Sequence, residues 1–175
     1  MKFCQTSHSF THSWEQVSAG WWQKYPNENA PHVLSVDVLN QQVDAKTGCI
    51  RTERLVACKQ NVPILIKKIF GADDVSYARE VIEVDPKAKT FTVFSRNLTN
   101  SELLAMEEKV VYCPDPNDSS KTLLTQEAQF TALTRFSSYV EDFCVKRFRD
   151  NAAVGRQGFE MVLNRLFSGN NAAAI

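Results

Sequence analysis

The chain has 175 residues, of which 43% are apolar, and its 20 Lys and Arg residues balance its 20 Asp and Glu residues. This length and apolar content fit one globular domain, while the balanced charge argues against nucleic acid as a partner and against a general attraction to anionic membranes. Any site for an anion must therefore be built locally, by a few cations.

The first predicted elements are a strand over residues 2–11 and a helix that begins after Ser13. Ser13 is a suitable N-cap because Gln16 stands three positions on and can complete a capping box. Apolar residues then follow at helical spacing up to Pro26, which is expected to end the helix. These apolar residues are Trp14, Val17, Trp21 and Tyr25.

Six further strands are predicted from apolar and polar patterning, at 32–43, 49–60, 75–85, 90–98, 102–113 and 121–133. Short turns rich in Pro, Asn, Asp and Gly separate most of them, which predicts antiparallel neighbours. A helical apolar pattern then runs from Phe136 to Phe167, with a bend allowed near Gly155 and Gly158.

These elements predict an α+β fold in which a curved, seven-stranded antiparallel sheet grips a long C-terminal helix. The domain is expected to span residues 1–167, and the small, polar tail at 168–175 is expected to fray. A sheet that grips a helix leaves a cavity between the two, so the sequence predicts a site for an apolar ligand.

A short apolar segment at residues 63–70 begins with a proline suited to the first turn of a helix. It is either an amphipathic turn packed on the sheet, or a mobile lid that touches a membrane with apolar side chains and lipid headgroups with lysines. The residues of this candidate lid are Ile64, Leu65, Ile66, Lys67, Lys68, Ile69 and Phe70.

Four polar residues are candidates for the cavity interior: Lys24, His32, Arg54 and Arg147. His32 and Arg54 share a strand face with apolar neighbours, Arg147 borders the apolar stripe of the last helix, and Lys24 is expected at the end of the first helix. For each of these residues alone, a solvated or helix-capping side chain is the simpler interpretation. Together they suit a phosphate, because a phosphate in an apolar cavity needs several donors to offset its desolvation.

No catalytic or metal-binding motif is evident. The five cysteines are scattered without zinc-ligand spacing, so free thiols are expected and no metal or cofactor is predicted. His8 and His12 span a strand end and a helix cap, so they do not form a helical ligand pair. The start of the chain lacks a signal-peptide pattern and no window is apolar enough to cross a bilayer, so composition alone indicates a cytosolic protein.

A series of short motifs runs along the chain: Lys24-Tyr25-Pro26-Asn27, Pro31-His32-Val33-Leu34, Thr52-Glu53-Arg54-Leu55, Val84-Asp85-Pro86, Arg96-Asn97-Leu98, Gln126-Glu127-Ala128, and Val140-Glu141-Asp142-Phe143 with Arg147-Phe148. In this order and spacing they resemble the PRELI family, the phospholipid-transfer proteins of the mitochondrial intermembrane space. The likeness extends to about Phe167.

The resemblance implies a helix-grip fold similar to steroid- and phosphatidylinositol-transfer domains, with one phospholipid in the cavity and a lid over its mouth. It implies transient contact with mitochondrial membranes and a location in the mitochondrial intermembrane space, in place of the cytosol. It also implies a small helical partner with twin cysteine motifs, which stabilises the protein after import.

With the resemblance, the candidates for headgroup binding become Lys24, His32, Arg54, Lys59, Arg147 and Arg156. Lys59-Gln60 is similar to the slowmo-like branch, which handles phosphatidylserine. Arg96-Asn97-Leu98 and Glu107-Glu108 look more like the branch that handles phosphatidic acid, which is slightly favoured.

The expected function is therefore phospholipid transfer without covalent chemistry, and two alternatives remain. The first is an enzyme that uses the same cavity, for which His32 with Glu80 or Glu108 is the candidate acid–base pair. The second is a protein-interaction module that binds its partner through the segment at 63–70 and Trp22.

Overall fold

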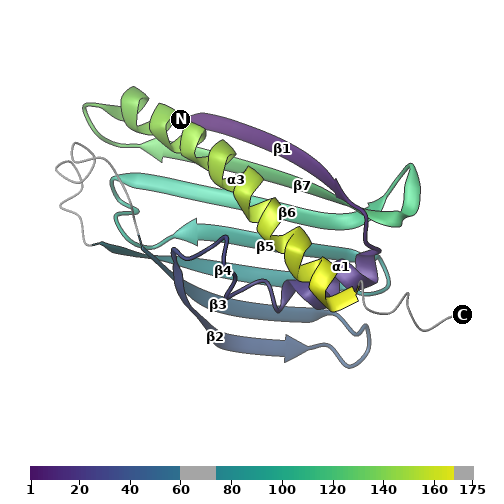
Figure 1. The fold of residues 1–175 in the computed structure, drawn as a ribbon. Coiled ribbons are helices and arrows are strands. Elements are labelled where there is room, and N and C mark those ends of the chain that lie inside the picture. The colour runs from purple at the N-terminus through teal and green to yellow at the C-terminus, as the bar shows by residue number, and fades with distance from the viewer. Residues whose placement is uncertain (60–73, 168–175) are drawn as a thin grey trace, which may run out of the picture.

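The computed structural model describes residues 1–59 and 74–167. They form one antiparallel sheet in the order β1-β7-β6-β5-β4-β3-β2, with the long helix α3 lying across its concave face (Figure 1). The elements are β1 Lys2–Phe10, α1 Trp14–Trp21, β2 Val33–Val43, β3 Ile50–Lys59, β4 Val75–Asp85, β5 Thr90–Asn97, β6 Leu104–Asp115, β7 Asp118–Ala132 and α3 Ser137–Phe167.

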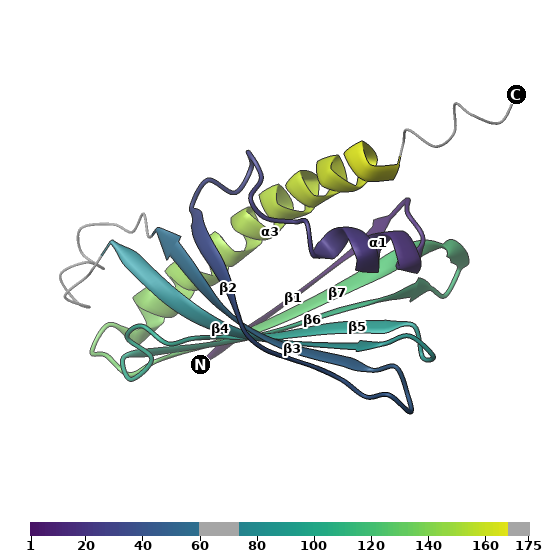
Figure 2. The same cartoon turned by 90° about the horizontal axis from the view of Figure 1, so that it is seen from below.

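The expected seven strands and final helix are confirmed, and the sheet is strongly curved around α3 (Figure 2). The first strand, β1, pairs with the last strand, β7. The two edges of the sheet are therefore β1 and β2, which are the first two strands in the sequence. α3 runs as one continuous helix through Gly155 and Gly158, where the sequence allowed a bend. The candidate lid at 64–70 and the tail at 168–175 lie outside the described residues.

Cross-strand register decides which side chains face α3. Residues directly opposite each other in an antiparallel pair point to the same face of the sheet. One such row crosses the sheet from β3 to β1 on the concave face: Arg54, Glu80, Ser95, Glu108, Ala128 and Cys4. Two carboxylates and one guanidinium therefore share the interior face.

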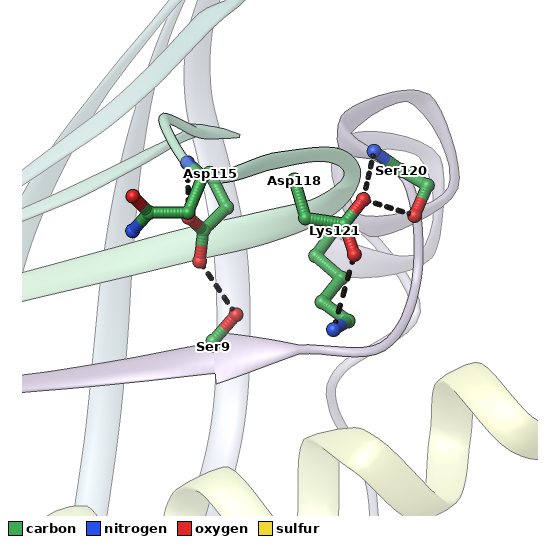
Figure 3. Close-up of polar contacts among 6 residues, drawn as sticks. Ser9, Asp115, Asp118, Ser120 and Lys121 are labelled. Carbon is green, nitrogen blue, oxygen red and sulfur yellow. Dashed lines mark hydrogen bonds and ion pairs between the residues drawn. The ribbon is translucent and has the colours of Figure 1, made fainter.

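The hairpin between β6 and β7 is tighter than the sequence indicated. The predicted strands end at residue 113 and resume at 121, but Pro114 and Asp115 still pair with β7. Asp115 accepts hydrogen bonds from the Asn117 backbone and from Ser9 Oγ, both at 2.9 Å (Figure 3). Hydrogen bonds from Ser120 and an ion pair with Lys121 lower the pKa of Asp118 to about 2. Asp115 thus satisfies an amide of the turn, and Asp118 satisfies an amide at the start of β7, where the register with β6 is shifted.

Helix α1 has the predicted start and a different end. Ser13 and Gln16 form the expected capping box. The helix stops at Trp21 instead of continuing to Pro26, because the next amides close i to i−3 turns, Gln23 N to Gly20 O at 3.0 Å and Lys24 N to Trp21 O at 3.1 Å. Lys24 therefore lies in a loop and not at the end of the helix.

The main hydrophobic core lies at one end of the molecule, where α1 and the C-terminal half of α3 meet the sheet. Its largest fully buried members include Phe10, Phe91 and Phe159. Gly20 allows the two helices to approach closely, since a Cβ there would lie 2.6 Å from Leu163 Cδ2. The other end of the sheet is packed by two smaller clusters beneath the first half of α3.

Candidate functional site

A cavity of about 530 Å³ lies between the concave face of the sheet and α3. Its walls come mainly from β3 to β7, with Phe10 of β1 and Val33 of β2, and from the inner face of α3 and the loop that follows α1. This volume falls within the range of about 300–1,000 Å³ that is typical of small-molecule sites. The hollow that the sequence predicted is therefore present, and both apolar and charged side chains line it.

Lys24 enters the cavity from the loop after α1. Asn27 organises this loop, because its Nδ2 donates to the Lys24 carbonyl at 2.6 Å and its Oδ1 accepts from the Asn29 amide at 3.0 Å. The Lys24 ammonium lies 5.3 Å from the ring centre of Tyr25 and 5.8 Å from that of Phe159. An ammonium over aromatic faces is held by cation–π attraction even where it has lost water.

Two opposing effects set the pKa of the Lys24 ammonium. Burial lowers it, but the negative charge that Tyr25 and Tyr112 carry when ionised, and that of Glu80 and Glu108, outweighs burial and raises the pKa above its ordinary value. Lys24 is therefore a cation at neutral pH, held among both apolar and charged side chains inside the cavity. A fixed and poorly hydrated cation is well suited to an anionic ligand group.

Arg54 does not line the cavity, although its strand face points inward. Its Nε and Nη2 donate to the same Glu80 oxygen, at 3.2 and 2.6 Å, and its guanidinium lies 4.3 Å from the ring centre of Trp21. Only 5% of the Arg54 surface is exposed, because its guanidinium is paired with Glu80 and packed on Trp21 of the core. The structure thus places it beneath the site and not among the groups that a ligand would meet.

Glu108 is the second interior carboxylate. Burial raises its pKa, and the hydrogen bond from the Gln126 amide and the charge of Lys24 only partly offset that effect. Glu80 acts in the same direction as burial, because two like charges share the interior. The site therefore combines a fixed cation with a carboxylate that is costly to ionise.

Two arginines of α3 complete the cationic side of the cavity. Arg147 and Arg156 both line it, and Arg156 Nη1 donates to Thr6 Oγ1 at 3.3 Å. Burial, and secondarily the charge of Arg147, lower the pKa of His32. His32 and Lys59 are exposed lining residues, joined by a 2.7 Å hydrogen bond from the Lys59 amide to the His32 carbonyl. Both residues lie at the mouth of the cavity.

Period-two alternation could have identified interior residues that the sequence analysis did not single out. Gln126 shares a strand face with Leu124 and Ala128, and Tyr112 shares one with Val110. Each stands in an apolar row, which marks a polar group that faces the core side of a sheet. Burial raises the pKa of Tyr112, so its hydroxyl stays neutral at neutral pH.

The cysteines are free thiols in the described part of the chain. Cys58 and Cys144 line the cavity, and burial raises the pKa of both, to about 11 for Cys144. Within residues 1–59 and 74–167 no group of three or more potential ligands is arranged for a metal ion. Neither helix described combines the length and hydropathy that a bilayer crossing requires.

A curved antiparallel sheet that holds a terminal helix across a ligand-sized cavity defines the helix-grip class. A START superfamily protein from Mycobacterium smegmatis shares this fold, with a TM-score of 0.56 and 10% identity over 94% of this chain and 98% of that one. The ZhuI aromatase/cyclase from Streptomyces is similar, with a TM-score of 0.65 and 10% identity over 97% of this chain and 98% of that one. These likenesses show the fold alone.

The chain belongs to the PRELI-like family, whose family model matches residues 15–169. It is 44% identical to Protein UPS2, mitochondrial, of Saccharomyces cerevisiae, over 97% of this chain and 75% of that protein. It is 34% identical to the slowmo homolog of Dictyostelium discoideum, over 87% of this chain and 67% of that protein. The family resemblance seen in the sequence is confirmed.

Proposed function

We propose that the protein extracts one phospholipid from a membrane, shields its acyl chains in the cavity and releases it at another membrane, without covalent chemistry. The observation that carries this proposal is the cavity itself, which joins apolar walls to the cations Lys24, Arg147 and Arg156. Each methylene removed from water contributes about 0.8 kcal/mol, so apolar walls supply affinity and cations select the headgroup.

The headgroup proposal places phosphatidylserine ahead of phosphatidic acid, which reverses the order that the sequence favoured. The reason is the carboxylate of Glu108, which shares the cavity with Lys24. A ligand with an ammonium can pair with that carboxylate, whereas the headgroup of phosphatidic acid offers only negative charge. His32 and Lys59 at the cavity mouth remain parts of the proposed site, and we keep residues 64–70, which lie outside the described residues, as the candidate lid.

The cellular setting follows the relatives. UPS2 is named a mitochondrial protein. We place this protein in the mitochondrial intermembrane space, in transient contact with membranes and bound to a small helical partner with twin cysteine motifs. An enzyme in the same cavity is less favoured, since the charge that acts on His32 is that of Arg147 and not of a carboxylate.

The transfer test uses donor liposomes with fluorescent phosphatidylserine or phosphatidic acid, unlabelled acceptor liposomes, and the protein with its partner. We expect transfer of at least one of the two lipids, with phosphatidylserine faster. No movement of either lipid would refute the carrier function, and turnover of the lipid into a product would favour an enzyme.

The site is tested by the double variant Lys24→Glu with Arg147→Glu, which should abolish transfer while circular dichroism stays native. Arg149→Glu is the matched control, because Arg149 is an exposed residue two positions away on α3 and does not line the cavity. Transfer that is unchanged in the double variant would remove Lys24 and Arg147 from the site.

A further inference from the structure

In residues 1–59 and 74–167, two connections at the end of the sheet opposite α1, with the helix turn that follows one of them, expose four large apolar side chains. They are Leu133 and Phe136 in the connection from β7 to α3, Tyr139 in the first turn of α3 and Leu98 in the β5–β6 hairpin. Their exposed fractions are 71%, 58%, 47% and 41%. We call these four residues the apolar rim. Figure 1 shows that both connections lie at the same end of the molecule.

Hydrogen bonds from backbone amides hold the apolar rim in place. The Leu133 amide donates to the Leu103 carbonyl at 2.8 Å, which joins the β7–α3 connection to the β5–β6 hairpin. The Ala132 amide donates to the buried carboxylate of Glu141 at 3.0 Å, and the Val140 amide donates to the Phe136 carbonyl at 3.0 Å. The side chains are therefore displayed on a fixed corner of the fold.

This corner also borders the cavity. Asn100 and Leu104 of the β5–β6 hairpin line the cavity, as do Val140 and Phe143 of the first turns of α3. The opposite end is filled by the main core around Phe10, Phe91 and Phe159. An apolar ligand that left the cavity at the corner would pass beside exposed apolar side chains, and would enter water unless another apolar phase covered them.

We propose that the apolar rim is a membrane-contacting surface, which inserts Leu133, Phe136, Tyr139 and Leu98 into the interfacial region of a lipid bilayer. The side chains at this corner suit a lipid bilayer. Tyr139 has an apolar body with a polar tip, and the exposed Arg135 between Leu133 and Phe136 can extend its guanidinium to the phosphate level. The surface adds a docking site to the proposed carrier and is tested without any transfer measurement.

The test is flotation of the full-length protein with phosphatidylcholine vesicles, which have no net charge. The variant Leu133→Ser with Phe136→Ser should bind at least about tenfold more weakly, because two inserted apolar side chains are lost. The control is Val38→Ser with Val43→Ser, since these β2 residues are 61% and 64% exposed and lie away from the rim. The control should bind as the wild type does.

Hydrogen exchange of the wild type supplies a second readout that needs no variant. Vesicles should slow exchange at residues 98–103 and 133–139, and leave the turn at 44–48 unchanged. Vesicle binding that is equal in the rim variant and the control, or an absence of protection at the corner, would overturn the proposal. Concentration-dependent dimers that the rim variant abolishes would assign the surface to a second copy of this chain, and would overturn it too.

Native mass spectrometry separates this proposal from the carrier function. A rim variant that no longer floats but still carries co-purified phospholipid has lost docking and kept its cavity. A wild type that binds vesicles through the rim and never carries lipid would leave the docking surface standing and refute the carrier function.

Discussion

The guanidinium of Arg54 and the carboxylate of Glu80 form an ion pair beneath the cavity, with Arg54 Nη2 2.6 Å from Glu80 Oε2. The two residues are 26 positions apart in the sequence and directly opposite in the register of β3 and β4. The pair neutralises Arg54, which does not line the cavity, whereas Lys24, Arg147 and Arg156 do line it.

Breaking this pair should destabilise the fold. Arg54→Met leaves the Glu80 carboxylate, whose side chain is 17% exposed, without its partner, and should lower the free energy of unfolding by about 3 kcal/mol. Urea denaturation measures the change. The double variant Arg54→Met with Glu80→Leu should recover most of the loss, because no unpaired charge remains.

A surface pair on the same two strands is the control. Arg51 and Glu83 also join β3 to β4, but their side chains are 46% and 53% exposed. Arg51→Met should cost less than about 1 kcal/mol, since exposed ion pairs contribute little. Equal losses from Arg51→Met and Arg54→Met would show that burial of the Arg54–Glu80 pair is not what makes it matter.

The raised pKa of Glu108 predicts that the stability of the protein depends on pH. The Glu108 pKa is raised above the ordinary value of 4.5, so the folded state binds this proton more tightly than the unfolded state. Its contribution to stability is complete below pH 4.5 and is lost as pH rises through the raised pKa. Glu108→Gln, which can still accept the hydrogen bond from Gln126, should therefore be more favourable relative to wild type at pH 7.5 than at pH 4.

Urea unfolding of both proteins at the two pH values measures this difference. Glu80 and Lys24 also act on Glu108, so each comparison is made within one pH, where both groups are common to the two proteins. A stability difference that is the same at pH 4 and pH 7.5 would mean that Glu108 titrates normally in the folded protein.

Two helical glycines predict opposite effects of the same substitution. Gly20→Ala would place a Cβ 2.6 Å from Leu163, which is fully buried, and should cost about 1–3 kcal/mol through overpacking. Gly155→Ala would meet nothing within 4 Å and should stabilise by about 0.5–1 kcal/mol, because alanine favours the helix. Denaturant midpoints measure both. Stabilisation by Gly20→Ala would contradict the close contact between α1 and α3.

The reactivity of Cys58 and Cys144, which line the cavity, can show whether a ligand occupies it. The Cys144 thiol, with its pKa raised to about 11 by burial, should react slowly with iodoacetamide at pH 7.5, since the thiolate is the nucleophile. A bound phospholipid should slow Cys58 and Cys144 further, because both line the cavity, and should leave Cys113, which does not line it, unchanged. Mass spectrometry of each labelled peptide, with and without lipid, measures the rates. Equal protection of Cys113 would point to global stabilisation instead of occupancy.

The sequence located the elements well, because strand alternation, the Ser13–Gln16 capping box and the pattern from Phe136 to Phe167 are local signals. It misplaced the end of α1, since the apolar spacing continues to Tyr25 while the chain turns at Gly20 to Lys24. Helical spacing cannot reveal that residues 22–24 form a turn, and it is this turn that places Lys24 in the cavity.

By itself, the sequence determined the fold class, the family and a short set of cations, because periodicity and motif order are written along the chain. Tertiary structure alone decided how those cations differ. Cross-strand register joined Arg54 to Glu80, the Asn27 loop turned Lys24 inward, and the path of α3 brought Arg147 and Arg156 to the same cavity. The physical reason is that charge pairing and desolvation depend on distances between residues that are remote in sequence.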